Sequence, residues 1–211
     1  MYLTEAVLEP VRREFGVPRE ATAAAVFTPR EFGLLHYCRR KNRAHDITLM
    51  IRDHEGRFAL IRKPVYPPGV FRPPSGGVEP GEAFSAGVLR EAWEETGLEI
   101  CLERYLLRCR AEFSCGDEML PWTTHVFVAR TTATVLDPQD RHEIAEACWA
   151  TSTEMLGPYR DAMLAMGSAG MRYRVDLQDL VLALLGKAQW DGAEGRLVVL
   201  CGEAGAMDAP A

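Results

Sequence analysis

The stretch GGVEPGEAFSAGVLREAWEETGL, residues 76 to 98, decides how the rest of this 211-residue chain is interpreted. Residues 83 to 96 contain no proline and are rich in Ala, Leu, Glu and Arg. Gly97 follows them, at the position where a glycine commonly ends a helix. We therefore expect one helix over residues 83 to 96, preceded by a glycine-rich loop.

Three carboxylates share one face of this predicted helix, because Glu91, Glu94 and Glu95 fall within an arc of about 100°. Hard divalent ions such as Mg²⁺ take oxygen ligands and often share them with substrate phosphates. An acidic cluster beside a glycine-rich loop therefore points to metal-assisted phosphate chemistry, although a solvated helix face can carry the same residues. The opposite side of the helix offers an apolar stripe for burial, made of Leu89, Ala92, Thr96 and part of Trp93.

The spacing of the fixed residues narrows the interpretation. Five residues separate Gly76 from Glu82 and seven separate Glu82 from Arg90, so the stretch reads G-x5-E-x7-R-E-A-x-E-E-x-G-L. This pattern resembles the Nudix box, the signature of hydrolases that act on nucleoside diphosphates linked to another moiety. All fixed letters of the box are present, and Ala92 and Leu98 occupy its apolar positions.

The resemblance implies a metal site and roles for the box residues. In the family the box glutamates hold Mg²⁺ or Mn²⁺ ions. The implied metal ligands are Glu91, Glu94, Glu95 and the carbonyl of Gly76. Arg90 matches the arginine that pairs with a box glutamate and holds it in place. Glu82 matches the glutamate at the end of the loop, which supports the metal site.

The resemblance also implies an α/β fold, a Nudix-type α/β/α sandwich with a mixed β-sheet, over residues 46 to 190. Residues 1 to 45 form an N-terminal extension, in which helical spacing of apolar residues predicts a helix ending near Gly16. The rest of the extension, an irregular or strand segment, is expected to cover a sheet edge or to build the interface of a homodimer. Residues 191 to 211 are expected to be a partly disordered tail, with an edge strand in the apolar run from residue 197 to 201.

Residues 137 to 149 look like the loop and strand near the end of many Nudix domains. A glutamate there often supplies another metal ligand or the general base that activates water. Spacing from Trp149 favours Glu143 over Glu146, and His142 is a third candidate because histidine titrates near neutrality. An exposed loop charge is the alternative interpretation for all three.

Two regions suggest substrate-binding residues. Residues 63 to 74 contain five prolines, so we expect a stiff surface loop. Arg62, Lys63 and Arg72 are well placed there to bind phosphate oxygens, and an exposed charge is the alternative role for each. Phe71 in this loop either stacks on a base or packs beneath the loop. A basic run of Arg39, Arg40, Lys41 and Arg43 can attract phosphate, but we interpret it as a solvated surface.

A second recognition loop is expected between two predicted strands, at residues 114 to 122. Trp122 is its best stacking residue for the leaving moiety, and a core anchor is the alternative role. In some family subtypes a proline or a tyrosine marks the substrate class. Ser114 and Gly116 stand at those two positions here, so neither ADP-ribose nor diadenosine polyphosphate is singled out.

Composition limits the classes of partner. The chain is 47% hydrophobic and 26% charged, which suits one substantial core. Its net charge of −6 argues against nucleic acid or an anionic membrane as the main partner. No apolar run approaches the roughly 20 residues of a membrane helix, and no signal-peptide core follows the N-terminus, so we predict a cytoplasmic protein.

Together these features predict a metal-dependent hydrolase that cleaves a phosphoanhydride bond in a small nucleoside diphosphate derivative, with Mg²⁺ or Mn²⁺ as its cofactor. Two alternatives stay open. One is a Nudix-fold sensor that binds a nucleotide without cleaving it, which the retained box carboxylates disfavour. The other is a hydrolase of capped RNA, which the acidic balance disfavours.

Overall fold

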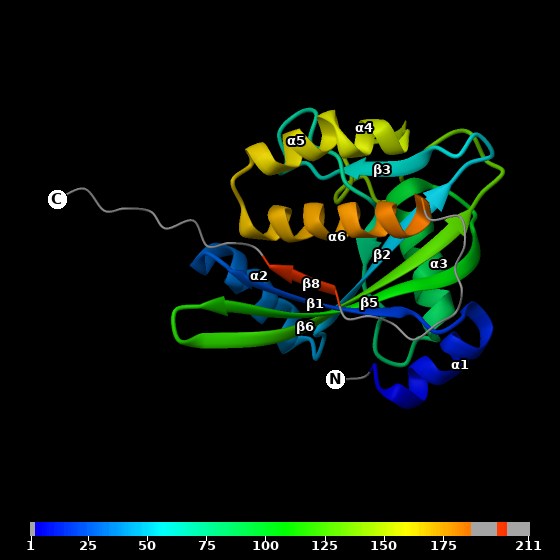
Figure 1. Ribbon diagram of the computed structural model, residues 1–211. Helices are drawn as coiled ribbons and strands as arrows, with labels where there is room; N and C mark the ends of the chain where they lie inside the picture. Colours follow the sequence, from blue (N-terminus) through cyan, green and yellow to red (C-terminus); the bar gives the residue numbers. More distant parts are fainter. Residues whose placement is uncertain (1–2, 187–197, 202–211) are drawn as a thin grey trace.

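The computed structural model describes residues 3 to 186 and 198 to 201. The elements, which Figure 1 shows, are α1 (Glu5–Phe15), β1 (Arg19–Val26), α2 (Pro29–Arg40), β2 (His45–Arg52), β3 (Phe58–Arg62), β4 (Ser75–Gly76), α3 (Phe84–Thr96), β5 (Cys101–Cys115), β6 (Glu118–Arg130), β7 (Glu146–Ala150), α4 (Ser152–Leu156), α5 (Pro158–Ala165), α6 (Ala169–Gly186) and β8 (Val198–Cys201). Among the described residues, no helix combines the length and the apolar character needed to cross a membrane.

One mixed sheet organises the fold, with strand order β7-β3-β2-β6-β5-β1-β8 and the short β4 paired to β2. Strand β2 runs parallel to β6, and β1 runs parallel to both β5 and β8. The β2–β3, β3–β7 and β5–β6 pairs are antiparallel. Alternating apolar and polar residues on both sides of residues 53 to 56 predict a hairpin there, and the antiparallel pair β2–β3 confirms it.

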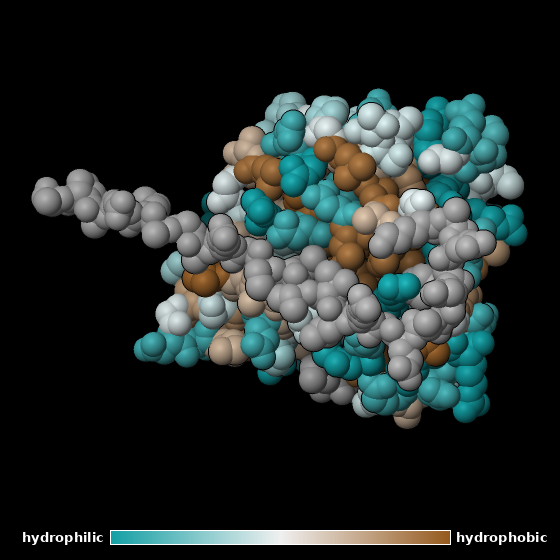
Figure 2. Space-filling model, in the orientation of Figure 1, coloured by the Kyte–Doolittle hydropathy of each residue, from teal (hydrophilic) through white to brown (hydrophobic). Residues whose placement is uncertain are grey.

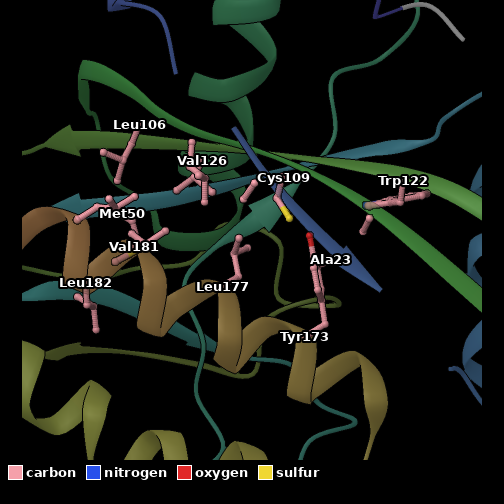
Figure 3. Packing of buried hydrophobic residues seen from close by; sticks show 14 of the residues in the cluster. Ala23, Met50, Leu106, Cys109, Trp122, Val126, Tyr173, Leu177, Val181 and Leu182 are labelled. Carbon is pink, nitrogen blue, oxygen red and sulfur yellow. The ribbon is translucent and has the colours of Figure 1, made fainter. Parts of the chain in front are cut away.

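Helices cover both faces of this sheet (Figure 1), with α1 and α3 on one side and α4, α5 and α6 on the other. Alternation along β2 supplies both cores: Ile47 and Leu49 pack with α1 and α3, whereas Met50 belongs to the cluster that includes α6. Figure 3 shows the second cluster, in which Leu177 and Val181 of α6 lie against the sheet. The predicted α/β/α sandwich with a mixed sheet is confirmed.

The N-terminal extension is built into the sandwich. Helix α1 ends before Gly16, as predicted, and β1 pairs with β5 over its full length. Helix α2 begins with a capping box, in which Thr28 accepts from the Glu31 backbone N–H and the Glu31 side chain accepts from the Thr28 N–H. Buried residues of α2 join the core on the α6 side. The extension therefore adds a strand and two helices to the domain.

Two local predictions need correction. Residues 114 to 122 are not a loop, because β5 continues to Cys115 and β6 begins at Glu118 after the short turn at Gly116. The sequence also predicts one helix over residues 152 to 166, but the structure has two, α4 and α5, because Gly157 between them takes a non-helical backbone conformation. The edge strand expected at 197 to 201 is confirmed for 198 to 201 as β8, whereas the rest of the predicted tail lies outside the described residues.

On the face seen in Figure 2, hydrophobic residues gather over α6. Hydrophilic residues occupy most of the rim of this face. The α6 face thus carries the apolar part of this view.

Candidate active site

Helix α3 presents the carboxylates, and its burial pattern fixes their orientation. The helix ends at Gly97, whose φ of 72° is left-handed and whose N–H donates to the Trp93 carbonyl. Its buried face runs through Val88, Ala92 and Glu95, whereas Leu89 and Trp93 are 42% and 46% exposed. The predicted apolar stripe is therefore confirmed for Ala92 and Thr96, which are buried, and wrong for Leu89 and Trp93.

Arg90 holds the box together as a central donor. Its guanidinium donates to both carboxylate oxygens of Glu82, to Oε1 of Glu91 at 3.1 Å and to Oε2 of Glu94 at 2.8 Å. It also donates to the Gly77 carbonyl at 3.0 Å. These carboxylates raise the pKa of Arg90, with the Glu82 hydrogen bonds as the largest cause, and Arg90 in turn lowers the pKa of Glu82. Arg90 thereby ties the glycine loop to the acidic face of α3.

Glu91 lies directly against the glycine loop. Its Oε1 accepts from the Gly77 backbone N–H at 3.0 Å. A Cβ on Gly76 would come within 1.7 Å of the Glu91 carboxylate, so only glycine leaves room for this arrangement. The glycine at the start of the box is therefore a steric requirement of Glu91.

Glu95 is the buried carboxylate of the set, with 4% of its surface exposed. Burial raises its pKa to about 7, against the opposing charges of Arg72 and Lys63. Its Oε2 accepts from the Ser75 N–H at 2.7 Å, while the nearest cations, Lys63 and Arg72, each stand 3.9 Å from Oε1. Glu95 is thus a poorly neutralised carboxylate at the floor of the site.

These groups face an open cleft with a volume of about 730 Å³. Its acidic lining consists of Glu79, Glu91, Glu94, Glu95, Asp140 and Glu143. Its basic lining consists of Lys41, Arg43, Lys63 and Arg90. The loop from Ser75 to Pro80 and the C-terminal end of α2 complete the walls. A cleft with both signs of charge can hold an anionic ligand together with a cation.

Of the three general-base candidates, the structure brings one to the cleft. Glu143 lines the cleft, and its Oε2 accepts from Lys63 Nζ at 2.7 Å. Glu146 instead pairs with Arg62, and His142 is exposed outside the lining. The loop that carries Glu143 is docked on α3, because the Glu94 carbonyl accepts from the N–H groups of residues 139 and 140. The C-terminal end of α3 therefore positions Glu143 as well as the box glutamates.

Of the predicted substrate-binding residues, Lys63 lines the cleft, whereas Arg62, Phe71, Arg72 and Trp122 do not. Arg62 donates to the Tyr66 carbonyl and to Glu146, and the buried Arg72 donates to the Pro73 carbonyl and to Ser75. The second half of the proline-rich segment is buried instead of forming a surface loop, because Arg72 pairs with Ile61 through two backbone hydrogen bonds.

Phe71 and Trp122 are core residues. Phe71 is 8% exposed and contacts Tyr159 edge to face, at a ring-centroid distance of 5.5 Å. Trp122 is 6% exposed, and its indole N–H donates to Asp46 at 3.1 Å. Figure 3 shows Trp122 among the buried residues beside α6. Of the two roles left open for Trp122, the structure supports the core anchor and not the stacking residue.

Sequence reasoning missed or undervalued the cations that do line the cleft. Lys41 and Arg43 belong to the run interpreted as a solvated surface, and Tyr37 drew no attention. The only available signal was their order in the chain, where the basic run directly precedes β2. Nothing local indicated that α2 reaches the glycine loop.

A divalent cation fits the acidic face by donor chemistry. Glu91, Glu94 and Glu95 offer carboxylate oxygens, the ligands that Mg²⁺ and Mn²⁺ take, and Glu95 lacks close neutralisation. In the described part of the chain no three acidic, His or Cys side chains already converge as a metal site. The Arg90 guanidinium and the backbone N–H groups of Ser75 and Gly77 hold the carboxylates that the ion would share.

Comparisons of this chain with family models, curated proteins and solved structures all match Nudix-domain proteins. The NUDIX domain family model matches residues 41–169, more than half of the chain. The NAD-capped RNA hydrolase NudC of Mycobacterium tuberculosis is 31% identical over 114 residues, which cover 52% of this chain and 33% of that protein. The NAD-capped RNA hydrolase NUDT12 of Macaca fascicularis is 29% identical over 100 residues, 47% of this chain and 20% of that protein.

The chain thus matches a third or less of the length of these two relatives. Among solved structures, a NUDIX-family hydrolase from Clostridium perfringens aligns with a TM-score of 0.42 and 20% identity, over 54% of this chain and 85% of the other. The family match, together with the intact box on α3, shows that this chain belongs to the Nudix hydrolases.

Proposed function

We propose that this protein hydrolyses a phosphoanhydride bond in a small nucleoside diphosphate derivative, with Mg²⁺ or Mn²⁺ as its cofactor. One observation carries the proposal: the box carboxylates and Glu143 line the same cleft as Lys41, Arg43 and Lys63. Carboxylates alone would repel a diphosphate. The combination of acidic groups for a cation and basic groups for phosphate oxygens suits a diphosphate that arrives with a divalent ion.

Glu91, Glu94, Glu95 and the Gly76 carbonyl would hold the ion. When bound, it supplies Lewis-acid polarisation of the phosphoryl oxygens and neutralises their charge. Arg90 keeps Glu91 and Glu94 aimed at the loop, through bonds of 3.1 and 2.8 Å. This pre-orientation reduces the reorganisation needed at the moment of reaction.

The chain's own residues supply the proton chemistry. Glu143 is the proposed general base, which takes a proton from the attacking water while a new P–O bond forms and the bond to the leaving phosphate breaks. Lys63 bonds Glu143 at 2.7 Å and would hold that carboxylate at the cleft wall. Hydrolysis consumes one water, whose oxygen ends on one phosphate product.

The test is a turnover screen with Mg²⁺ or Mn²⁺ over ADP-ribose, nucleotide sugars, diadenosine polyphosphates and nucleoside triphosphates. The Glu94→Gln variant should lower kcat about 100-fold or more for whichever compound turns over, because one ligand of the ion is lost. Glu99→Gln is the matched control, because Glu99 is exposed beyond the end of α3 and outside the cleft. Full activity of Glu94→Gln would refute the assignment, and tight binding without any turnover would favour a nucleotide sensor.

A second candidate substrate is the NAD-type end of a capped RNA. It is favoured by the two relatives described above, which are NAD-capped RNA hydrolases. Free NAD and an NAD-capped oligoribonucleotide, compared in the same assay, separate the two candidates. Cleavage of the capped oligonucleotide with no turnover of free NAD or any small compound would replace the first candidate with the second.

A further inference from the structure

The C-terminal end of α2 forms one wall of the catalytic cleft, although α2 precedes the residues that the family model matches. Leu34, Tyr37 and Cys38 of this helix line the cleft, followed by Lys41 and Arg43 in the turn into β2. The carboxylates of α3 line the same cleft. The end of α2, which lies before the matched residues, and Lys41 and Arg43, which lie within them, therefore face the carboxylates of α3 across the cleft.

Arg43 differs from Lys63 and Arg90 in the contacts that its side chain makes. Its guanidinium packs on the glycine loop, since a Cβ on Gly77 would come within 2.7 Å of an Arg43 terminal nitrogen. Its Nε is buried without a hydrogen-bond partner, and no ion pair to a described residue involves its side chain. The other cleft cations beside the acidic groups are paired, with Lys63 bonded to Glu143 and Arg90 to three glutamates. A partly buried, unpaired cation is costly unless an anion completes it.

Tyr37 provides an aromatic surface one turn before the cations. It is 51% exposed, and Leu34 next to it is 68% exposed. The ammonium of Lys41 lies 4.6 Å from the centroid of the Tyr37 ring and the guanidinium carbon of Arg40 lies 5.9 Å from it, so the ring carries cation–π contacts. An exposed ring bordered by cations suits a ligand that has both a flat base and phosphates.

We propose that this α2 wall, defined by Tyr37, Lys41 and Arg43, binds the nucleoside diphosphate part of the substrate. Arg43 bonds a phosphate oxygen beside the glycine loop, and Tyr37 stacks on the nucleobase. The inference rests on the proposed function, because it assigns the recognition half of the same cleft. It places substrate selection on the N-terminal extension instead of on the Nudix box.

The test uses two non-hydrolysable probes, α,β-methylene-ADP and methylenediphosphonate, titrated into the full chain in Mg²⁺ by calorimetry. Arg43→Gln should weaken both probes about 10-fold or more, because a charge-assisted bond to phosphate is lost. Arg43→Lys should restore part of the affinity. Tyr37→Ala should weaken α,β-methylene-ADP about 5-fold or more and leave methylenediphosphonate unchanged, because only the first has a base to stack.

Arg30→Gln is the matched control, because Arg30 is exposed on α2 and outside the cleft, and it should bind both probes as the wild type does. Wild-type affinity for both probes in Arg43→Gln overturns the proposal. Equal losses for both probes in Tyr37→Ala also overturn it, since a stacking role predicts a difference. A wild-type chain that binds neither probe overturns it as well.

The two proposals fail in different ways. Binding that depends on Arg43 and Tyr37, without turnover of any compound, supports the binding role of the α2 wall and refutes the hydrolase activity. Turnover with wild-type KM in both Arg43→Gln and Tyr37→Ala supports the hydrolase activity and refutes the binding role of the α2 wall. A raised KM with nearly unchanged kcat in Tyr37→Ala supports both.

Discussion

The Glu91 carboxylate occupies the space in which any side chain on Gly76 would begin, 1.7 Å from the ideal Cβ position. The strand that carries Gly76 pairs with β2, so the loop backbone has little freedom to withdraw. The carboxylate is the part that can move, because it is the far end of a flexible side chain. A side chain at position 76 would therefore change the orientation of Glu91, a proposed metal ligand.

Gly76→Ala should therefore damage activity more than stability. The added methyl group pushes Glu91 away from the Gly77 N–H and from Arg90, and a misplacement of about 1 Å at a catalytic group can cost about 100-fold in rate. We expect kcat to fall about 100-fold while the unfolding midpoint in urea changes little. Gly33→Ala is the control, because no atom lies within 4 Å of that Cβ and Gly33 is an exposed helix residue. Unchanged kcat in Gly76→Ala would contradict this coupling.

Gly97→Ala should instead destabilise the fold. Gly97 has a φ of 72°, and its Cβ would come within 2.1 Å of the Asp137 carbonyl oxygen, which is backbone. Left-handed strain costs about 1–2 kcal/mol, and the backbone clash adds to it, so we expect a loss of about 2–4 kcal/mol in the free energy of unfolding. Gly116→Ala should lose only the part of this stability that comes from backbone strain, because Gly116 has a φ of 59° and no atom lies within 4 Å of its Cβ position. Urea denaturation measures both, and equal losses would show that the Asp137 contact is unimportant.

The box helix could be predicted to within a residue, because its signals are local. Residues that favour helix precede Gly97, and a glycine with positive φ ends the helix as expected. The burial of Glu95 was missed for a physical reason. Glu95 stands seven residues after the buried Val88 and so shares its side of the helix, but the apolar stripe was centred on Leu89.

The proposed recognition half of the site could not be predicted, because it depends on packing between distant segments. Arg43 meets the glycine loop only after α2 and β2 have taken their places. The prediction of a loop at residues 114 to 122 was wrong for a different reason. The β5–β6 pairing continues through this segment, and even Pro121 lies within β6 opposite Glu112.

Trp122 offers a direct check on its corrected role. Trp122→Ala removes a large buried side chain and should lower the free energy of unfolding by about 3–5 kcal/mol. Trp122→Phe should lose about 1–3 kcal/mol, through the lost bond to Asp46 and the smaller volume. In Trp122→Phe, calorimetric affinity for α,β-methylene-ADP should equal that of the wild type. A selective loss of that affinity, with normal stability, would return Trp122 to the substrate site.

His125 makes the fold sensitive to acid. It is 2% exposed on β6, its Nδ1 meets the Tyr105 hydroxyl, and its ring lies 6.2 Å from that of His45. Burial, and then the charges of His45 and Arg108, lower the pKa of His125 from 6.5 to about 3. Since the folded-state pKa is the lower one, the unfolded state binds more protons between these values. The stability that His125 contributes is complete above pH 6.5 and is lost as pH falls toward 3.

Replacing His125 should therefore flatten the dependence of stability on pH. At pH 5, 1.5 units below the unfolded-state pKa, this residue accounts for a loss of about 2 kcal/mol relative to neutral pH. Urea denaturation of His125→Gln between pH 7 and pH 5 should show that much less change than the wild type, whatever its stability at pH 7. His54→Gln is the control, because His54 is exposed in the β2–β3 turn and should keep the wild-type dependence. If both variants follow the wild-type curve, the buried His125 is not the source of the acid sensitivity.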